Sequence, residues 1–265
     1  MFLLTREVRF AINADGSPAP DGPNGFAGRP SLTGFGIYLQ LQATFQGSLD
    51  PVSSYLRNIK DIDIEVREKC VPAIGRFVAE ESPVERCLSQ LVRLLDESDP
   101  VSSTPPVRLV ALQLCLSPQL SFSWSATEPL MIRLSQMFEF AAAHRLHNPD
   151  FSDEQNLATF GKCNNPMGHG HNYQVKVTIQ GVPGKSGVLM PVDQLEKIVE
   201  QQLIEHFDHK HLNHQVPEFQ NQNPSVELIA QASYRRLKDA LAGNGVTLAS
   251  VTVWETPKTW CEYSE

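Results

Sequence analysis

Histidine is distributed very unevenly along this sequence. All eight histidines lie between His144 and His214, and the first 143 residues contain none. Neutral imidazole is a common metal ligand, and histidine is the side chain whose charge ordinarily changes near neutral pH. We therefore expect the chemistry of this chain to reside in its C-terminal half, where imidazoles could hold a metal ion or move protons.

Two of these histidines, His169 and His171, flank a glycine in the segment GHGHNYQVKVTIQG. Its alternating apolar and polar residues predict a strand, in which residues i and i+2 project to the same face. A third imidazole is available from His144, at the end of an upstream strand-like run, although His147 competes for this place. Three protein ligands with an open position are typical of catalytic zinc. A structural histidine pair is the alternative, and we favour zinc.

A cysteine and an Asp–His pair offer proton-transfer chemistry nearby. Cys163 lies six residues before His169 in the turn-like segment GKCNNPMGHGH, which could bring its thiol toward the metal. A thiolate beside a cation can act as a base or nucleophile, whereas an inert buried cysteine and a fourth metal ligand are the alternatives. Asp208 next to His209 could form a proton relay or a polar helix end, and the residues alone leave both open.

The elements that would position these residues occur twice. Segment 34–47 aligns without gaps with segment 168–181, and six of the fourteen positions are identical. In both copies a strand-like run precedes the segment, and two helical stretches and further strand-like runs follow it. We predict an α+β fold of two tandem modules, each an antiparallel four-stranded sheet with two helices on one face. The predicted domains are residues 1–128 and 129–265.

The first copy lacks the candidate metal ligands. Phe35 and Ile37 stand where the second copy has His169 and His171. The scaffold therefore tolerates apolar residues at both positions, which indicates that the histidines are not present to fill space.

Acidic side chains extend the candidate site. Glu255 has apolar neighbours in the strand-like segment VTVWET, and its counterpart in the first copy is Leu116. A buried carboxylate needs partners, and a heterocycle with an N–H and an exocyclic amino group would supply two. Glu227 opens a predicted helix after Ser225, a possible cap, so it has a capping interpretation as well. Its counterpart Glu85 is kept in the first copy, which favours a structural role.

Composition narrows the classes of partner and compartment. The net charge is −8 and no block of Lys or Arg occurs, so we expect no nucleic-acid partner. No apolar run reaches membrane-spanning length, and the N-terminal segment turns charged after four residues, unlike a signal peptide. The five cysteines are odd in number and widely spaced, which argues against a disulfide framework and for the cytoplasm.

The second half of the chain resembles the 6-pyruvoyl-tetrahydropterin synthase family. The similarity spans residues 131–265 and rests on the segments FEFAAAHRL, FGKCNNPMGHGHNY, FDHKHLN, NPSVE and VTVWET. It implies the tunnelling fold, whose modules associate into a β-barrel with active sites at module interfaces, and hence a homo-oligomer. It also implies the zinc-dependent conversion of 7,8-dihydroneopterin triphosphate to 6-pyruvoyl-tetrahydropterin with elimination of triphosphate.

The resemblance assigns a role to each candidate residue. The implied zinc ligands are His144, His169 and His171. The implied catalytic residues are Cys163 as the proton-abstracting base and Asp208 with His209 as the relay. The implied substrate-binding residues are Glu255, Ser225 and Glu227. Cations near enough in sequence to meet the triphosphate are Arg145, Lys162, Lys210 and Lys258.

Two competing hypotheses stay open at this point. The first is a 6-carboxytetrahydropterin synthase-type lyase of the deazapurine (queuosine) pathway, although that branch usually has a shorter CxxxHGH spacing. The second is a non-catalytic zinc- or pterin-binding module in which Cys163 ligates the metal. Met167 and the Ser225–Val226 pair depart from the family pattern and bear on substrate preference. The N-terminal module is expected to be an inactive partner without metal ligands.

Overall fold

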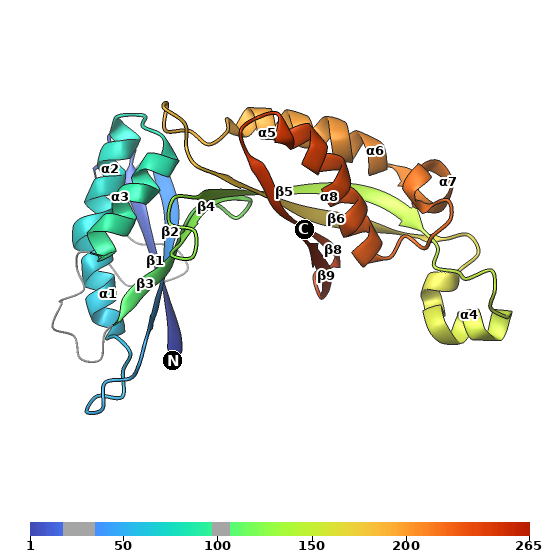
Figure 1. Ribbon diagram of the computed structural model, residues 1–265, viewed down its shortest axis with the longest axis horizontal. Coiled ribbons are helices and arrows are strands. Elements are labelled where there is room, and N and C mark those ends of the chain that lie inside the picture. Colours follow the sequence, from blue (N-terminus) through green and yellow to red (C-terminus); the bar gives the residue numbers. More distant parts are fainter. Residues whose placement is uncertain (18–34, 97–106) are drawn as a thin grey trace. The chain divides into compact units, whose positions relative to one another are not determined.

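The computed structural model of the chain describes residues 1–17, 35–96 and 107–265 (Figure 1). The chain divides into two compact units, and each is described by itself. The first unit comprises residues 1–134 and 181–189, and the second comprises residues 135–180 and 190–265. Gly34, the first residue of the repeated segment, lies outside the described residues.

The first unit is an antiparallel sheet with helices on one face (Figure 1). Its strands follow the order β1-β2-β3-β4. They are β1 (Phe2–Asn13), β2 (Gly36–Gly47), β3 (Arg108–Ser117) and β4 (Leu120–Ser125). The helical segments are α1 (Ile59–Glu65), the π-helical turn η1 (Val66–Cys70), α2 (Val71–Ala79) and α3 (Val84–Asp96).

Period-two alternation explains why the sheet of the first unit buries one face. Along β2, the side chains of Leu39, Leu41 and Phe45 are buried, whereas the intervening Gln40 and Gln42 are partly exposed. Alternate residues of a strand point to opposite faces, so the apolar set meets the helices and the glutamines form the other face.

The second unit carries the strand order β5-β6-β8-β9. These strands are β5 (Ile132–His144, whose first residues belong to the first unit), β6 (His169–Gly181), β8 (Thr247–Thr256) and β9 (Thr259–Tyr263). The helices after β6 are α5 (Val192–Val199), the π-helical turn η3 (Glu200–Ile204), α6 (Glu205–Phe207) and α8 (Val226–Ala242). Shorter segments are α4 (Asp153–Phe160), the 3-10 turns η2 (Gly161–Asn164) and η4 (Pro217–Phe219), and α7 (Leu212–Gln215).

The structure confirms an α+β fold with an antiparallel sheet and helices, but not two four-stranded sheets. The described residues contain nine strands, because Lys210 and His211 form an additional strand, β7. This strand pairs in parallel with Ala142 and Ala143 of β5. A two-residue strand is too short to produce a periodic sequence pattern, which is why its segment does not predict a strand.

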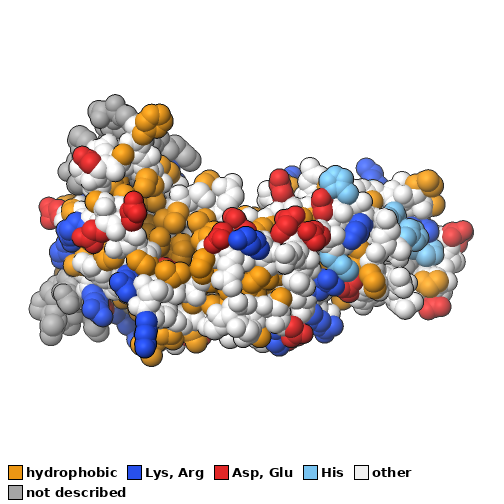
Figure 2. Space-filling view, turned by 90° about the horizontal axis from the view of Figure 1, so that it is seen from above, with side chains coloured by type: hydrophobic (Ala, Val, Ile, Leu, Met, Phe, Trp, Pro, Cys, Tyr) orange, Lys and Arg blue, Asp and Glu red, His pale blue; other side chains and the backbone are white. Residues whose placement is uncertain are grey.

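The apolar character of the helices and the distribution of surface charge bear on whether the chain meets a membrane or a nucleic acid. Within the described residues, none of the helices combines the length and apolar character that crossing a membrane requires. On the face drawn in Figure 2, Lys and Arg side chains are interspersed with Asp and Glu, and the histidines lie among charges of both signs.

Candidate metal centre

Three imidazoles converge at one end of strands β5 and β6. His144 is the last residue of β5, and His169 and His171 are the first and third residues of β6. One ring nitrogen from each lies within 4.8 Å of the other two. The Nε2 atoms of His144 and His169 are 3.1 Å apart. This arrangement follows from the strand periodicity, which places residues 169 and 171 on the same face.

The surroundings of the imidazoles fit a metal ion. His144 is fully buried, and its Nδ1 donates to the carbonyl oxygen of Pro224 at 2.7 Å, which leaves a lone pair on Nε2, the atom that faces His169. Nε2 of His171 is buried and has no hydrogen-bond partner among the described residues. Burial lowers the pKa of His144 to about 4 and also lowers the pKa of His171, so both rings are neutral at pH 7. Neutral imidazole, with a lone pair on one ring nitrogen, is the form that binds metal.

The other candidate for the third ligand, His147, belongs to a different environment. Its Nδ1 lies 3.0 Å from Oδ1 of Asn164, and its backbone N–H donates to Asn223. Its side chain lines a polar pocket with Arg145 rather than joining the imidazole cluster. The structure therefore groups His144, and not His147, with the pair on β6.

Glu255 of β8 reaches the three-histidine cluster. Its Oε1 lies 3.4 Å from Nε2 of His144 and 3.7 Å from Nε2 of His171. The carboxylate also borders a pocket of about 730 Å³ with Asn172 of β6 and the segment from Thr256 to Pro257. A polar acid at the border of a pocket can accept hydrogen bonds from a ligand that enters it.

Cys163 lies in η2, close enough to Glu255 and Tyr173 for electrostatic interaction. Its carbonyl oxygen accepts a hydrogen bond from the backbone N–H of Leu146, which ties the turn to the end of β5. Burial and then the negative charge of Glu255 raise the pKa of Cys163. The side chain is therefore a thiol at neutral pH unless a nearby cation stabilises the thiolate.

Local sequence features define the start of α4, the helix that precedes this turn. Helix α4 begins with a capping box between Ser152 and Gln155, and the buried Asn156 bonds the backbone of Asn148, Phe151 and Ser152. Helix α4 is not among the predicted elements, although the Ser-x-x-Gln spacing is a recognisable start signal.

Gly168 allows the chain to enter β6 beside the metal ligands. Its φ is +73°, and a Cβ there would lie 3.0 Å from the carbonyl oxygen of His144 and 2.8 Å from Nε2 of His211. Positive φ and close backbone approach both favour glycine.

Asp208 and His209 form a hydrogen-bonded pair at the end of α6. Nδ1 of His209 lies 2.6 Å from Oδ2 of Asp208. Both residues are also tied to Ala141 of β5. The Ala141 N–H donates to Oδ1 of Asp208, and the His209 N–H donates to the Ala141 carbonyl oxygen. The bond from Ala141, followed by that from His209, lowers the pKa of Asp208. His209 has a φ of +56° and an 83% exposed side chain. The pair is thus held rigidly at the surface, where it could exchange protons with a ligand.

The helix-end interpretation has direct support at the next residue, Lys210. Nζ of Lys210 donates to the carbonyl oxygens of Glu205 and His206, which are C-terminal carbonyls of the helix. This lysine is therefore occupied, which weakens its candidacy as a triphosphate ligand.

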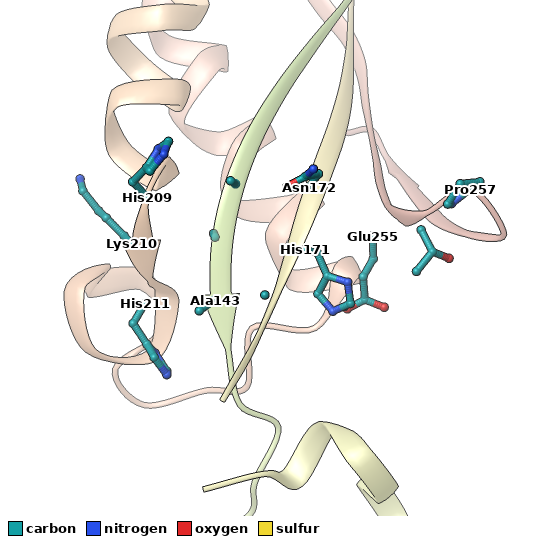
Figure 3. Close-up of a pocket in the computed structure, with 12 residues that line it drawn as sticks. Ala143, His171, Asn172, His209, Lys210, His211, Glu255 and Pro257 are labelled. Atoms are coloured by element: carbon teal, nitrogen blue, oxygen red, sulfur yellow. The ribbon is translucent and has the colours of Figure 1, made fainter. Parts of the chain in front are cut away.

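The predicted catalytic residues are not all brought together in one chain. His209 and His171 border the same pocket, but His209 and Lys210 lie on one side of the two strands in Figure 3, and Glu255 and Pro257 lie on the other. Cys163 has electrostatic contact with Glu255 and Tyr173, and the described residues show none between it and Asp208 or His209.

Ser225 and Glu227 have structural contacts. The Ser225 hydroxyl accepts a hydrogen bond from the Leu228 N–H and caps α8, as its sequence position suggests. Glu227 is exposed, and its charge acts on Cys261 of β9. In the first unit, the counterpart Glu85 is 3% exposed and accepts from the Leu189 N–H at 2.7 Å.

The fold and the site together define an α+β protein with a three-histidine centre suited to a metal ion. The model of the 6-pyruvoyl tetrahydropterin synthase family matches residues 133–265. The chain belongs to this family, and its relatives indicate that it is an enzyme of the pterin synthase class.

Several relatives are similar over the same half of the chain. The 6-pyruvoyl tetrahydrobiopterin synthase of Homo sapiens is 39% identical over 125 residues, which are 47% of this chain and 85% of the relative. The 6-carboxy-5,6,7,8-tetrahydropterin synthase of Haemophilus influenzae is 29% identical over 156 residues, with 51% of this chain and 100% of the relative covered. The solved 6-pyruvoyl tetrahydropterin synthase of Caenorhabditis elegans is 35% identical with a TM-score of 0.48, and the match covers 51% and 96% of the two chains.

Proposed function

We propose that this protein converts 7,8-dihydroneopterin triphosphate to 6-pyruvoyl-tetrahydropterin in a zinc-dependent reaction that eliminates triphosphate. The observation that carries this proposal is the convergence of three imidazoles beside Glu255 in a member of the pterin synthase family. The similarity to proteins named 6-pyruvoyl tetrahydrobiopterin synthase supports the choice of substrate.

His144, His169 and His171 would hold the zinc ion. A zinc ion bound there would polarise the side-chain hydroxyl groups of the substrate and, through its charge, favour the thiolate form of Cys163. Cys163 would take a proton from the substrate side chain, and His209, oriented by Asp208, would return a proton at another carbon. The 2.6 Å contact between Asp208 and His209 supports the relay, because a carboxylate on Nδ1 fixes the ring tautomer.

Glu255 would anchor the pterin ring. A carboxylate can accept two parallel hydrogen bonds, and the pterin ring presents an N–H and an exocyclic amino group side by side. The position of Glu255 between the histidines and the pocket supports this role. We also propose that Ser225 and Glu227 border the bound substrate, although the contacts described above give both a structural function as well.

We propose that the active protein is a homo-oligomer in which modules form a β-barrel. The separation of Cys163 from the Asp208–His209 pair supports this, because a second copy of the chain could place its own pair beside the cysteine. A cytoplasmic location is proposed as well, and the free thiols of all five cysteines support it.

We further propose that residues 1–128 are a degenerate copy of the catalytic module 129–265. Both units have a π-helical turn, at 66–70 and at 200–204, which are 134 residues apart. Both also have a strand irregularity at equivalent places, between Thr44 and Phe45 and between Thr178 and Ile179. Matching irregularities support a common origin better than matching regular elements, because regular elements recur in unrelated folds.

The test is turnover of 7,8-dihydroneopterin triphosphate by protein of measured zinc content. We expect 6-pyruvoyl-tetrahydropterin and triphosphate as products, and activity that a chelator removes and zinc restores. Release of acetaldehyde would instead establish the 6-carboxytetrahydropterin synthase reaction, which the Haemophilus influenzae relative makes the second candidate. Absence of turnover in protein that has bound zinc would refute both reactions.

A further inference from the structure

Tyr173 has a buried hydroxyl group without a partner. It is fully buried in β6, two residues beyond His171 on the same face, and its ring stacks on Phe140 with centroids 4.9 Å apart. It makes edge-to-face contacts with the rings of His171 and His144, with centroids 5.5 and 6.2 Å apart. The hydroxyl has no hydrogen-bond partner among the described residues. Burying an unpaired hydroxyl is costly, so the functioning protein is expected to supply a partner.

The strand register makes Glu255 a candidate partner for this hydroxyl. In the antiparallel ladder between β6 and β8, Gln174 lies opposite Trp254. Continued by one residue, this register places Tyr173 opposite Glu255, with both side chains on the face that carries the histidines. Glu255 and Cys163 are also the two ionisable groups whose charge acts on the phenol. A protonated phenol can donate, and a carboxylate accepts.

The first unit provides an internal comparison. The register between β2 and β3 pairs Gln40 with Cys115, so Leu39 lies opposite Leu116. Leu39 is the repeat counterpart of Tyr173, and Leu116 is the counterpart of Glu255. The phenol and the carboxylate are therefore replaced together by an apolar pair. Leu39 is 1% exposed, so the scaffold packs this position without a hydroxyl.

We propose that Tyr173 is a positioning residue for Glu255, to whose carboxylate it donates a hydrogen bond that fixes the orientation in which Glu255 binds the pterin ring. The inference rests on the proposed function, because it assumes that Glu255 is the pterin anchor. The Oε1 atom of Glu255 faces the histidines, and the terminal carboxylate torsion of glutamate is soft. A hydrogen bond from the phenol would hold the carboxylate in a single orientation, which lowers the cost of ordering it when the ligand binds.

The experiment compares Tyr173→Phe with Tyr234→Phe in zinc-loaded protein. Tyr234 is a suitable control because it is 2% exposed in α8 and donates to the Leu248 carbonyl, away from the cluster. For Tyr173→Phe we expect unchanged zinc content, a kcat within about twofold of wild type, and weaker binding of dihydroneopterin triphosphate. Loss of a hydrogen bond to a charged group corresponds to about 10- to 100-fold in KM. Tyr234→Phe should leave KM unchanged.

A double-mutant cycle with Glu255→Gln identifies the partner. If Tyr173 acts through Glu255, adding Tyr173→Phe to Glu255→Gln should weaken binding by no more than about twofold. A full additional loss would overturn the proposal in favour of direct contact between Tyr173 and the substrate. A fall in kcat at constant KM would also overturn it, since this result would assign the hydroxyl to Cys163.

A structural measurement separates this inference from the proposed function. In a crystal structure of the zinc-loaded protein, the oxygen of Tyr173 should lie within about 3.0 Å of a Glu255 carboxylate oxygen. A separation without a hydrogen bond would refute the inference whatever the activity. If wild-type protein neither binds nor converts the pterin but this bond is present, the proposed function fails and only the hydrogen bond remains established.

Discussion

Replacing Gly168 with alanine tests whether the entry to β6 positions the metal ligands. Gly245→Ala is a matched control, because the two glycines have φ values of +73° and +76° but different surroundings. At Gly245 an added Cβ would meet nothing within 4 Å, whereas at Gly168 it would press on the His144 carbonyl oxygen at 3.0 Å. Both variants share the cost of alanine in the left-handed region, which is about 1–2 kcal/mol.

The variants should therefore differ in metal binding rather than in backbone strain. We expect urea titration of the metal-free proteins to show that each variant loses about 1–2 kcal/mol of unfolding free energy, with a further loss for Gly168→Ala. Displacement of the His144 backbone also disturbs the bond between its ring and the Pro224 carbonyl. Loss of such an outer contact typically weakens metal affinity by about 10- to 100-fold.

The assay is competition for Zn²⁺ between each variant and a chromogenic chelator. Gly168→Ala should show the weakened affinity, and Gly245→Ala should bind zinc as wild type does. Equal zinc affinity in the two variants would refute the argument that contact with His144 is what requires glycine at this position. A loss of affinity in Gly245→Ala would show that general destabilisation, and not local geometry, controls binding.

Three further predictions follow from the thiols and one ion pair. Cys163→Ala should abolish turnover and leave zinc content intact; loss of zinc would instead make the cysteine a ligand. Burial raises the pKa of Cys70 and of Cys87 to about 12, so iodoacetamide at pH 8 should leave both unmodified in the folded protein, and peptide mass spectrometry showing rapid labelling would contradict this burial. Although burial alone would raise it, the pKa of Glu218 is lowered, because hydrogen bonds from His206 and Arg236 outweigh that effect. Glu218→Gln should therefore destabilise the protein above about pH 4.5, with the difference from wild type shrinking as the pH falls further, and a difference that grows in acid would show the opposite sign.

The parts of the site that follow strand periodicity are predictable from the sequence. The pair His169 and His171 shares a face because residues i and i+2 always do, and a long alternating run identifies β6. That His144 joins this pair could be inferred only from its place at the end of a predicted strand. The absence of ligands from the first copy strengthened this inference more than any single residue did.

Contacts between residues distant in the chain explain what the sequence did not reveal. The Pro224 carbonyl that orients His144 is 80 residues away, and a backbone oxygen leaves no residue type to recognise. Tyr173 resembles an ordinary aromatic strand residue, and only the structure shows that its hydroxyl is unpaired. Strand β7 forms because α6 ends beside β5, which is a property of packing and not of two residues.

The apolar pair Leu39 and Leu116 indicates what the catalytic chemistry costs the fold. At the equivalent positions of the second unit, the hydroxyl of Tyr173 and a nitrogen of the neighbouring His171 are buried without partners among the described residues. Each such group opposes folding by about 1–3 kcal/mol until something binds it. On the proposed duplication, the first unit contains a version of this sheet end adapted to packing, and the second unit contains a version adapted to ligands. The second should be the more dependent on its ligands for stability, so metal supply in the cell would also influence how much folded protein accumulates.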